Sequence, residues 1–176
     1  MDKKEFEYIY KTYMPILYRT AYRMVKNDAD ALDIVQDAFI RILNGLKNFR
    51  NQANIQTWMY RIVMNLCYDY FRKRKKIVFV SEKDIFDSET GAETPATDDI
   101  KRMEIENQRK QNLHIALERL TLRQKTVFIL RIYEELSYQQ IAKIMKIKIG
   151  TAKATFFQAV EKIKVIMKQM EKNELQ

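Results

Sequence analysis

Apolar residues recur three and four positions apart over most of the chain, which is the spacing of amphipathic helices. In the first half this pattern predicts helices over about 4–25, 31–48 and 56–75. Pro15 interrupts the first run, so we expect either a kink or two abutting helices there. The residues between the first two runs, 27–30 (NDAD), are typical of a break followed by an N-cap.

The last third of the chain carries two N-terminal helix signatures. Thr121 with Gln124, and Ser137 with Gln140, have the spacing of capping boxes. They predict helices over about 108–119, 122–134, 138–145 and 150–170. A short helix, a tight turn and a longer basic helix form a helix-turn-helix pattern, which reads DNA with the start of its second helix. A plain helical hairpin has the same local pattern.

The elements predict an all-α protein of two small helical domains. A three-helix domain covers 1–76 and a four-helix domain covers 108–176, joined by a flexible acidic linker over 77–107, within which a helix resumes near Asp98 or Asp99. Three glycines and two prolines are too few for a turn-rich β fold. The single cysteine, Cys67, excludes an intramolecular disulfide, which fits a reducing compartment. We expect Cys67 to be a small buried apolar residue. Without an apolar signal core or a membrane-length apolar run, we expect a cytoplasmic protein with no membrane insertion.

The formal charge of +9 is unevenly distributed. Residues 1–76 hold 15 Lys/Arg against 8 Asp/Glu, a net of +7, and residues 107–176 hold 14 against 6, a net of +8. Residues 77–106 hold 3 against 9, a net of −6. Two basic blocks on either side of an acidic connector indicate a polyanionic partner. Two solvated Lys-rich surfaces would give the same count.

The third predicted helix has one apolar face, with Met59, Val63 and Leu66, and one polar face. Arg61, Asn65 and Asp69 follow one another on the polar face, and five consecutive cations end the helix at 72–76. Such a face can hold a nucleic acid and touch its bases. We assign the neighbouring Trp58 to the core.

No metal-ligand set, phosphate loop or nucleophile motif occurs in the chain, and His114 stands alone. We therefore predict no catalytic residue, no metal, no cofactor and no enzyme activity.

The second predicted helix carries an acidic block in a basic domain. Asp33, Gln36 and Asp37 must face outward, because Val35 belongs to the core face. The block either compensates the helix dipole or contacts a positively charged protein.

Three segments in this order resemble bacterial sigma factors of the sigma-70 family, in its extracytoplasmic-function (ECF) group. Residues 31–43 (ALDIVQDAFIRIL) resemble the helix that binds core polymerase, and residues 49–76 resemble the loop and helix for the −10 element. Residues 117–159 resemble the domain that reads the −35 element. The family implies docking on the RNA polymerase core, through the beta-prime clamp and the beta flap, and opening of promoter DNA. It also implies an anti-sigma factor as a regulator.

The resemblance assigns a role to each matching residue. The polymerase clamp would meet Asp33, Gln36 and Asp37. The −10 DNA would contact Phe49, Arg50, Asn54, Arg61, Asn65, Asp69, Arg72, Lys73 and Arg74. The −35 DNA would contact Lys148, Thr151, Lys153, Ala154, Phe157 and Gln158.

The chain departs from the family pattern in the helix-turn-helix. Lys146 stands where the turn usually has Gly, and Lys148 stands where a small polar N-cap is frequent. Thr155 and Gln158 occupy positions that are often Arg, so we predict an altered −35 preference. The alternative function is a conventional helix-turn-helix regulator with an N-terminal helical domain.

Overall fold

The computed structural model describes residues 3–46, 49, 54–78 and 98–174. Within these ranges the chain forms seven helices and no strand, which confirms the predicted all-α class. The helices are α1 (Lys3–Val25), α2 (Asp28–Leu46), α3 (Ile55–Val78), α4 (Asp98–Glu118), α5 (Leu122–Ile132), α6 (Tyr138–Met145) and α7 (Ile149–Glu174). The predicted flexible linker and the loop residues 50–53 lie outside the described residues, apart from the helical ends of the linker.

The helix boundaries follow from local chemistry that the sequence predicts. Asn27 caps α2, because its Oδ1 accepts from the Asp30 N–H at 3.0 Å. Both capping boxes are confirmed, at the starts of α5 and α6. Pro15 lies inside a single continuous α1, so the alternative of two abutting helices is wrong.

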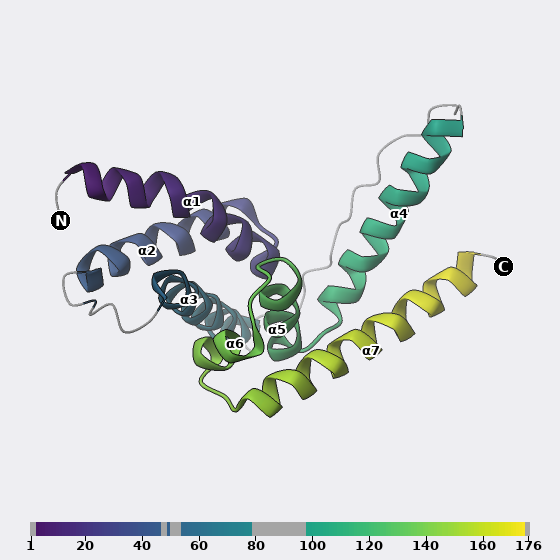
Figure 1. Ribbon diagram of the computed structural model, residues 1–176. Helices are drawn as coiled ribbons and strands as arrows, with labels where there is room; N and C mark the ends of the chain where they lie inside the picture. Colours follow the sequence, from purple (N-terminus) through teal and green to yellow (C-terminus); the bar gives the residue numbers. More distant parts are fainter. Residues whose placement is uncertain (1–2, 47–48, 50–53, 79–97, 175–176) are drawn as a thin grey trace.

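Helices α1, α2 and α3 pack together on one side of the molecule, and α4 and α7 extend together to the other (Figure 1). Helices α5 and α6 lie between them, with α1 against α5 and α3 against α6. The larger buried apolar cluster runs through both halves, from Leu17, Ile42 and Val63 to Ile129 and Ile141. A second cluster joins α4, α5 and α7. The C-terminal half is therefore docked on the N-terminal half.

Trp58 is packed against the core, as predicted, and a glycine makes room for it. A Cβ built on Gly45 would lie 2.6 Å from Cζ2 of Trp58, well inside contact distance. The other side of the indole meets Phe49, with ring centroids 5.1 Å apart. Helix α2 and the residue that opens the following loop therefore hold this ring from two sides.

We predict that Gly45→Ala lowers the free energy of unfolding by about 1–3 kcal/mol, because overpacking forces the indole to move. Urea denaturation measures the change. Gly150→Ala is the matched control, since a Cβ there meets no atom within 4 Å and alanine favours the helix. Equal stability changes in the two variants would contradict the role given to Gly45.

None of the helices described is long and apolar enough to cross a membrane. Cys67 is buried, as predicted, and burial raises the pKa of its thiol to about 12. The thiol therefore stays protonated and unreactive near neutral pH.

Candidate nucleic-acid interface

Helix α3 separates an apolar face from a polar one as the sequence predicts. Met59 and Val63 are fully buried, whereas Arg61 and Asn65 are exposed. Among the described residues, neither exposed side chain has a hydrogen-bond or ion-pair partner. Both are consequently available to a ligand along one stripe of the helix.

Three further residues of this predicted surface have partners within the chain, namely Asp69, Arg72 and Arg74. Asp69 pairs with Arg72, at 2.8 Å between Oδ1 and Nη2. The Arg74 guanidinium donates to the Tyr70 hydroxyl oxygen at 2.7 Å, and that hydroxyl in turn donates to Asp30 at 2.7 Å. Of the described terminal cations, Arg72 is thus paired with a carboxylate, whereas Arg74 donates to a neutral hydroxyl and keeps its full charge.

Asn54, which the resemblance places at the DNA, caps α3. Its Oδ1 accepts from the Gln56 N–H at 2.9 Å, and its carbonyl accepts from the Trp58 N–H at 3.2 Å. Phe49 lies half-buried against Trp58. Arg50 lies outside the described residues. The start of α3 and the end of the preceding loop are therefore fixed by capping and ring packing.

The acidic block of α2 is exposed at Asp33, Gln36 and Asp37. Because α2 begins at Asp28, Asp33 and Asp37 lie beyond its first turn, where the effect of the helix dipole has largely fallen off. The two aspartates and Asp69 line one hollow of about 220 Å³ between α2 and α3, together with the cations Arg41 and Lys73. The structure thus places Asp69 beside the acidic block, which the sequence did not predict.

The helix-turn-helix is formed by α6 and α7. Four of its predicted DNA-reading side chains are exposed near the start of α7 or just before it, namely Lys148, Lys153, Ala154 and Gln158. Phe157 is also exposed, by 63%, which is unusual for a phenyl ring and leaves it free to touch an apolar group such as a thymine methyl. Thr151 is half-buried.

Thr155 lines a hollow beside the predicted −35 residues but exposes little of its surface. It is buried, and its hydroxyl donates to the Thr151 carbonyl at 2.8 Å. Of the two departures from the family's frequent arginines, Gln158 alone faces outward. A predicted change in −35 preference therefore rests on Gln158.

The structure places Arg123 beside the predicted −35 residues, where the sequence gave no signal for it. A hollow of about 400 Å³ is shared by Arg123 and Gln124 at the start of α5 and by Thr151, Ala154 and Gln158 of α7. A cation beside an exposed helix start is suited to a DNA phosphate. Only the packing of α5 against α7 brings these residues together.

Lys146 closes α6 in the left-handed conformation, at φ 53° and ψ 49°. Its N–H donates to the Ala142 carbonyl, so the lysine fills the place where glycine is favoured.

We predict that Lys146→Gly raises the free energy of unfolding by about 1 kcal/mol, because a Cβ is strained in this conformation. Lys143→Gly, in the interior of α6, should lower it by about as much in the same denaturation assay. A destabilised Lys146→Gly variant would contradict the prediction.

Comparisons with known proteins agree with this geometry. The family model for sigma-70 region 2 matches residues 9–77, and that for sigma-70 region 4 matches residues 110–163. The RNA polymerase sigma factor SigV of Bacillus subtilis is 32% identical over 148 residues, which cover 84% of this chain and 82% of SigV. The ECF RNA polymerase sigma factor SigX of the same organism is 27% identical, over 96% and 85% of the two chains. The chain belongs to the ECF group of the sigma-70 family.

A solved structure shares the fold of this ECF sigma factor over nearly its whole length. The sigma factor RpoE of Bartonella quintana, in complex with the anti-sigma factor NepR, aligns with a TM-score of 0.73 at 24% identity, over 94% of this chain and 98% of that one. The chain is thus a promoter-specificity factor for transcription initiation, with RNA polymerase core and promoter DNA as its partners.

Within the described residues, no group of three or more His, Cys, Asp or Glu side chains is placed to hold a metal ion. The sigma-70 family is not an enzyme family.

Proposed function

We propose that this sigma factor reads promoter DNA with two separate surfaces and holds polymerase with a third. The exposed stripe of α3 binds the melted −10 strand, and the start of α7 binds the −35 duplex. The acidic face of α2 docks on the beta-prime clamp. One observation carries the proposal. Arg61 and Asn65 are exposed on one side of α3, while the residues on the opposite side of the same turns are fully buried.

The chemistry of each surface suits its DNA. An asparagine side chain can both donate to and accept from the edge of an unpaired base, and an arginine can reach a base or a phosphate. Gln158 can pair bidentately with adenine in the major groove. Bidentate hydrogen bonds to a base edge are worth about 1–3 kcal/mol each, so several together offset the cost of unpairing a short stretch.

The chain acts without a chemical step of its own. It binds open DNA more tightly than closed DNA and so shifts the equilibrium between them. We assign the polymerase and −10 contacts to residues 1–76, the connection to 77–107 and the −35 and beta-flap contacts to 108–176. The site of action is the cytoplasm, where promoter DNA and polymerase meet.

An anti-sigma factor is the proposed regulator. RpoE of Bartonella quintana, whose fold this chain shares, is solved in complex with the anti-sigma factor NepR. We infer a partner of the same class for this chain.

A comparison of DNA binding with and without polymerase tests the proposal against a conventional helix-turn-helix regulator. The purified chain is titrated onto promoter duplexes in a gel-shift assay, alone and with core enzyme. We expect tight, sequence-specific binding only when core is present. Tight specific binding by the chain alone, unaffected by core, would favour the regulator.

A further inference from the structure

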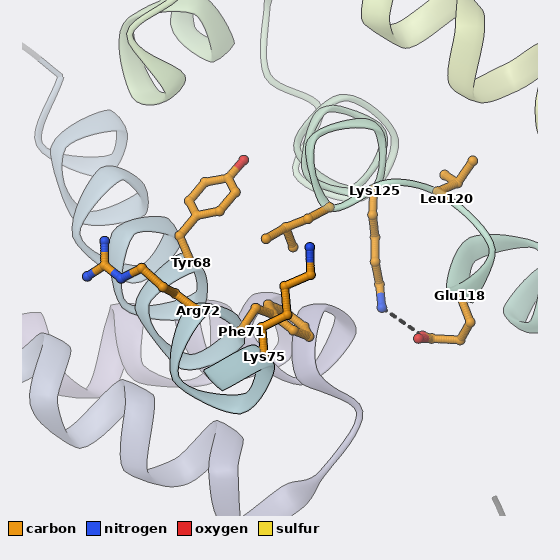
Figure 2. Close-up of a pocket in the computed structure, with 8 residues that line it drawn as sticks. Tyr68, Phe71, Arg72, Lys75, Glu118, Leu120 and Lys125 are labelled. Atoms are coloured by element: carbon orange, nitrogen blue, oxygen red, sulfur yellow. Dashed lines mark hydrogen bonds and ion pairs between the residues drawn. The ribbon is translucent and has the colours of Figure 1, made fainter. Parts of the chain in front are cut away.

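A groove of about 600 Å³ lies between α3 and the segment that joins α4 to α5 (Figure 2). Tyr68 and Phe71 of α3 form part of one wall, and Leu120 and Leu122 form part of the other. None of these four residues is assigned above to DNA or to polymerase. Pockets that hold small molecules have volumes of about 300–1,000 Å³. The groove is therefore large enough for a small molecule, and its apolar walls have no part in the proposed function.

The aromatic side chains of the groove are held in place by contacts within the protein. The Tyr68 hydroxyl donates to the Thr126 hydroxyl at 3.1 Å, and the Thr126 hydroxyl donates to the Leu122 carbonyl at 2.8 Å. The Phe71 ring meets the Tyr70 ring edge-on, with ring centroids 5.2 Å apart. A ligand with a flat apolar body can therefore bury its surface here without first ordering these side chains.

Cations outnumber acids among the described residues that line the groove, which are Arg72, Lys75 and Lys125 against Glu118. Glu118 pairs with Lys125 at 2.7 Å. Arg72 pairs at 2.8 Å with Asp69, which does not line the groove. Lys75 has no ion-pair or hydrogen-bond partner among the described residues. Figure 2 shows its side chain reaching from α3 toward α5. One positive charge in the groove is therefore left without a counter-ion.

Lys125 brings a buried ammonium to the same groove, because the residue is only 5% exposed. An ammonium carries three N–H donors, and the Glu118 carboxylate accepts from one of them. Burial lowers the pKa of Lys26 and of His114, and the charge of Lys125 lowers both further, whereas Glu118 raises both. One carboxylate thus faces several cationic groups. The positive potential beside Lys125 favours a further anion there.

We propose that this groove binds a small amphipathic anion. Its flat apolar body lies between the aromatic wall of α3 and the leucine wall, and its acidic head faces Lys75 and Lys125. The head is a carboxylate, a phosphate or a sulfonate, because an ammonium binds each of them as a point charge. A neutral apolar molecule would leave Lys75 without a counter-ion, and a small inorganic anion would leave the apolar walls in water. The site goes beyond the proposed function, since it needs neither promoter DNA nor polymerase.

Anilinonaphthalene sulfonate (ANS) tests the site in the full chain. The dye joins an aromatic body to a sulfonate, and it reports binding to apolar protein surface. A fluorescence titration should show saturable binding with one dye per chain. In amide NMR spectra, ANS should shift the signals of residues 68–75 and 118–125 and leave those at the start of α7 unchanged. Binding that does not saturate, or shifts centred elsewhere, would overturn the proposal.

Two exposed lysines of α3 that line different hollows provide a matched pair of variants. Lys75→Ala removes the cation without a counter-ion and should weaken ANS binding about five- to tenfold, because a charge-assisted contact is lost. Lys73→Ala removes a cation that lines the hollow between α2 and α3 instead. It should leave the affinity for ANS within about twofold at physiological salt, which screens exposed charges. Equal weakening by the two variants would show a response to overall charge and would overturn the site.

A neutral probe separates the acidic head from the apolar body. Phenylnaphthylamine keeps the aromatic body of ANS and lacks the sulfonate, so Lys75→Ala should leave its affinity within about twofold. An equal effect of Lys75→Ala on both dyes would show an apolar groove that does not select an anion, and the proposal would be wrong. The titrations use the free chain and contain no polymerase or DNA. Their failure is therefore distinct from a failure of the proposed function in transcription.

Discussion

Asp37→Arg is expected to weaken binding to RNA polymerase core by about thirtyfold or more. Asp37 is exposed in the middle of α2 and shares a hollow with Asp33 and Asp69. A reversed charge would face the basic surface of the clamp, and loss of one partner of an interfacial charge pair costs about 2–5 kcal/mol. Fluorescence anisotropy of labelled chain titrated with core measures the affinity.

The control for this variant is Glu7→Arg, which reverses an exposed charge on α1 that pairs with Lys11 of the same helix. It should leave the affinity for core within about twofold, since exposed pairs contribute little. Equal affinities of the Asp37→Arg variant and the wild-type chain would leave the acidic block without a role at polymerase.

Asn65→Ala is expected to lower the yield of open promoter complexes by about 5- to 150-fold, because loss of its hydrogen bonds leaves a base edge unsatisfied at a cost of about 1–3 kcal/mol. Core binding should stay within twofold, since Asn65 does not line the hollow that α2 and α3 share. Permanganate reactivity of unpaired thymines measures opening, and the anisotropy titration measures core binding.

Gln111→Ala, an exposed amide on α4, is the matched control and should open the promoter normally. Normal opening by Asn65→Ala would exclude this residue from the −10 contact. A parallel loss of core binding would place Asn65 at polymerase instead.

Local signals in the sequence predicted the helices well. The two capping boxes and the Asn27 cap fix helix starts through side chains within three residues of the backbone groups they satisfy. Such contacts depend on spacing alone. The face of α3 could likewise be derived from its period, because burial on one side leaves the other exposed.

Contacts between distant segments could not be predicted. Glu134 meets Thr20 and Tyr60 across 114 and 74 residues, and nothing in its neighbourhood along the chain marks it. Arg123 lies beside the predicted −35 residues only through the packing of α5 against α7. These placements depend on how helices from distant parts of the sequence pack together. The local spacing of apolar and polar residues does not predict that packing.

The sequence also does not predict which side chains bond to the protein's own backbone instead of facing DNA. The resemblance assigns Asn54 to DNA, whereas in the structure its carboxamide oxygen caps α3. Thr155 occupies a position that is often a DNA-reading arginine, yet its short side chain turns back to the helix backbone. A family pattern gives the position of a residue, whereas its partners depend on the side chain that is present.

Run-off transcription tests the central claim most directly. Core polymerase is supplied with a library of promoters that vary at the −10 and −35 elements, with and without the purified chain. We predict transcripts that require the chain and come from a defined subset of promoters. Two results would contradict the assignment of this protein as a promoter-specificity factor. One is no transcription in the presence of the chain, and the other is equal transcription from all promoters with and without the chain.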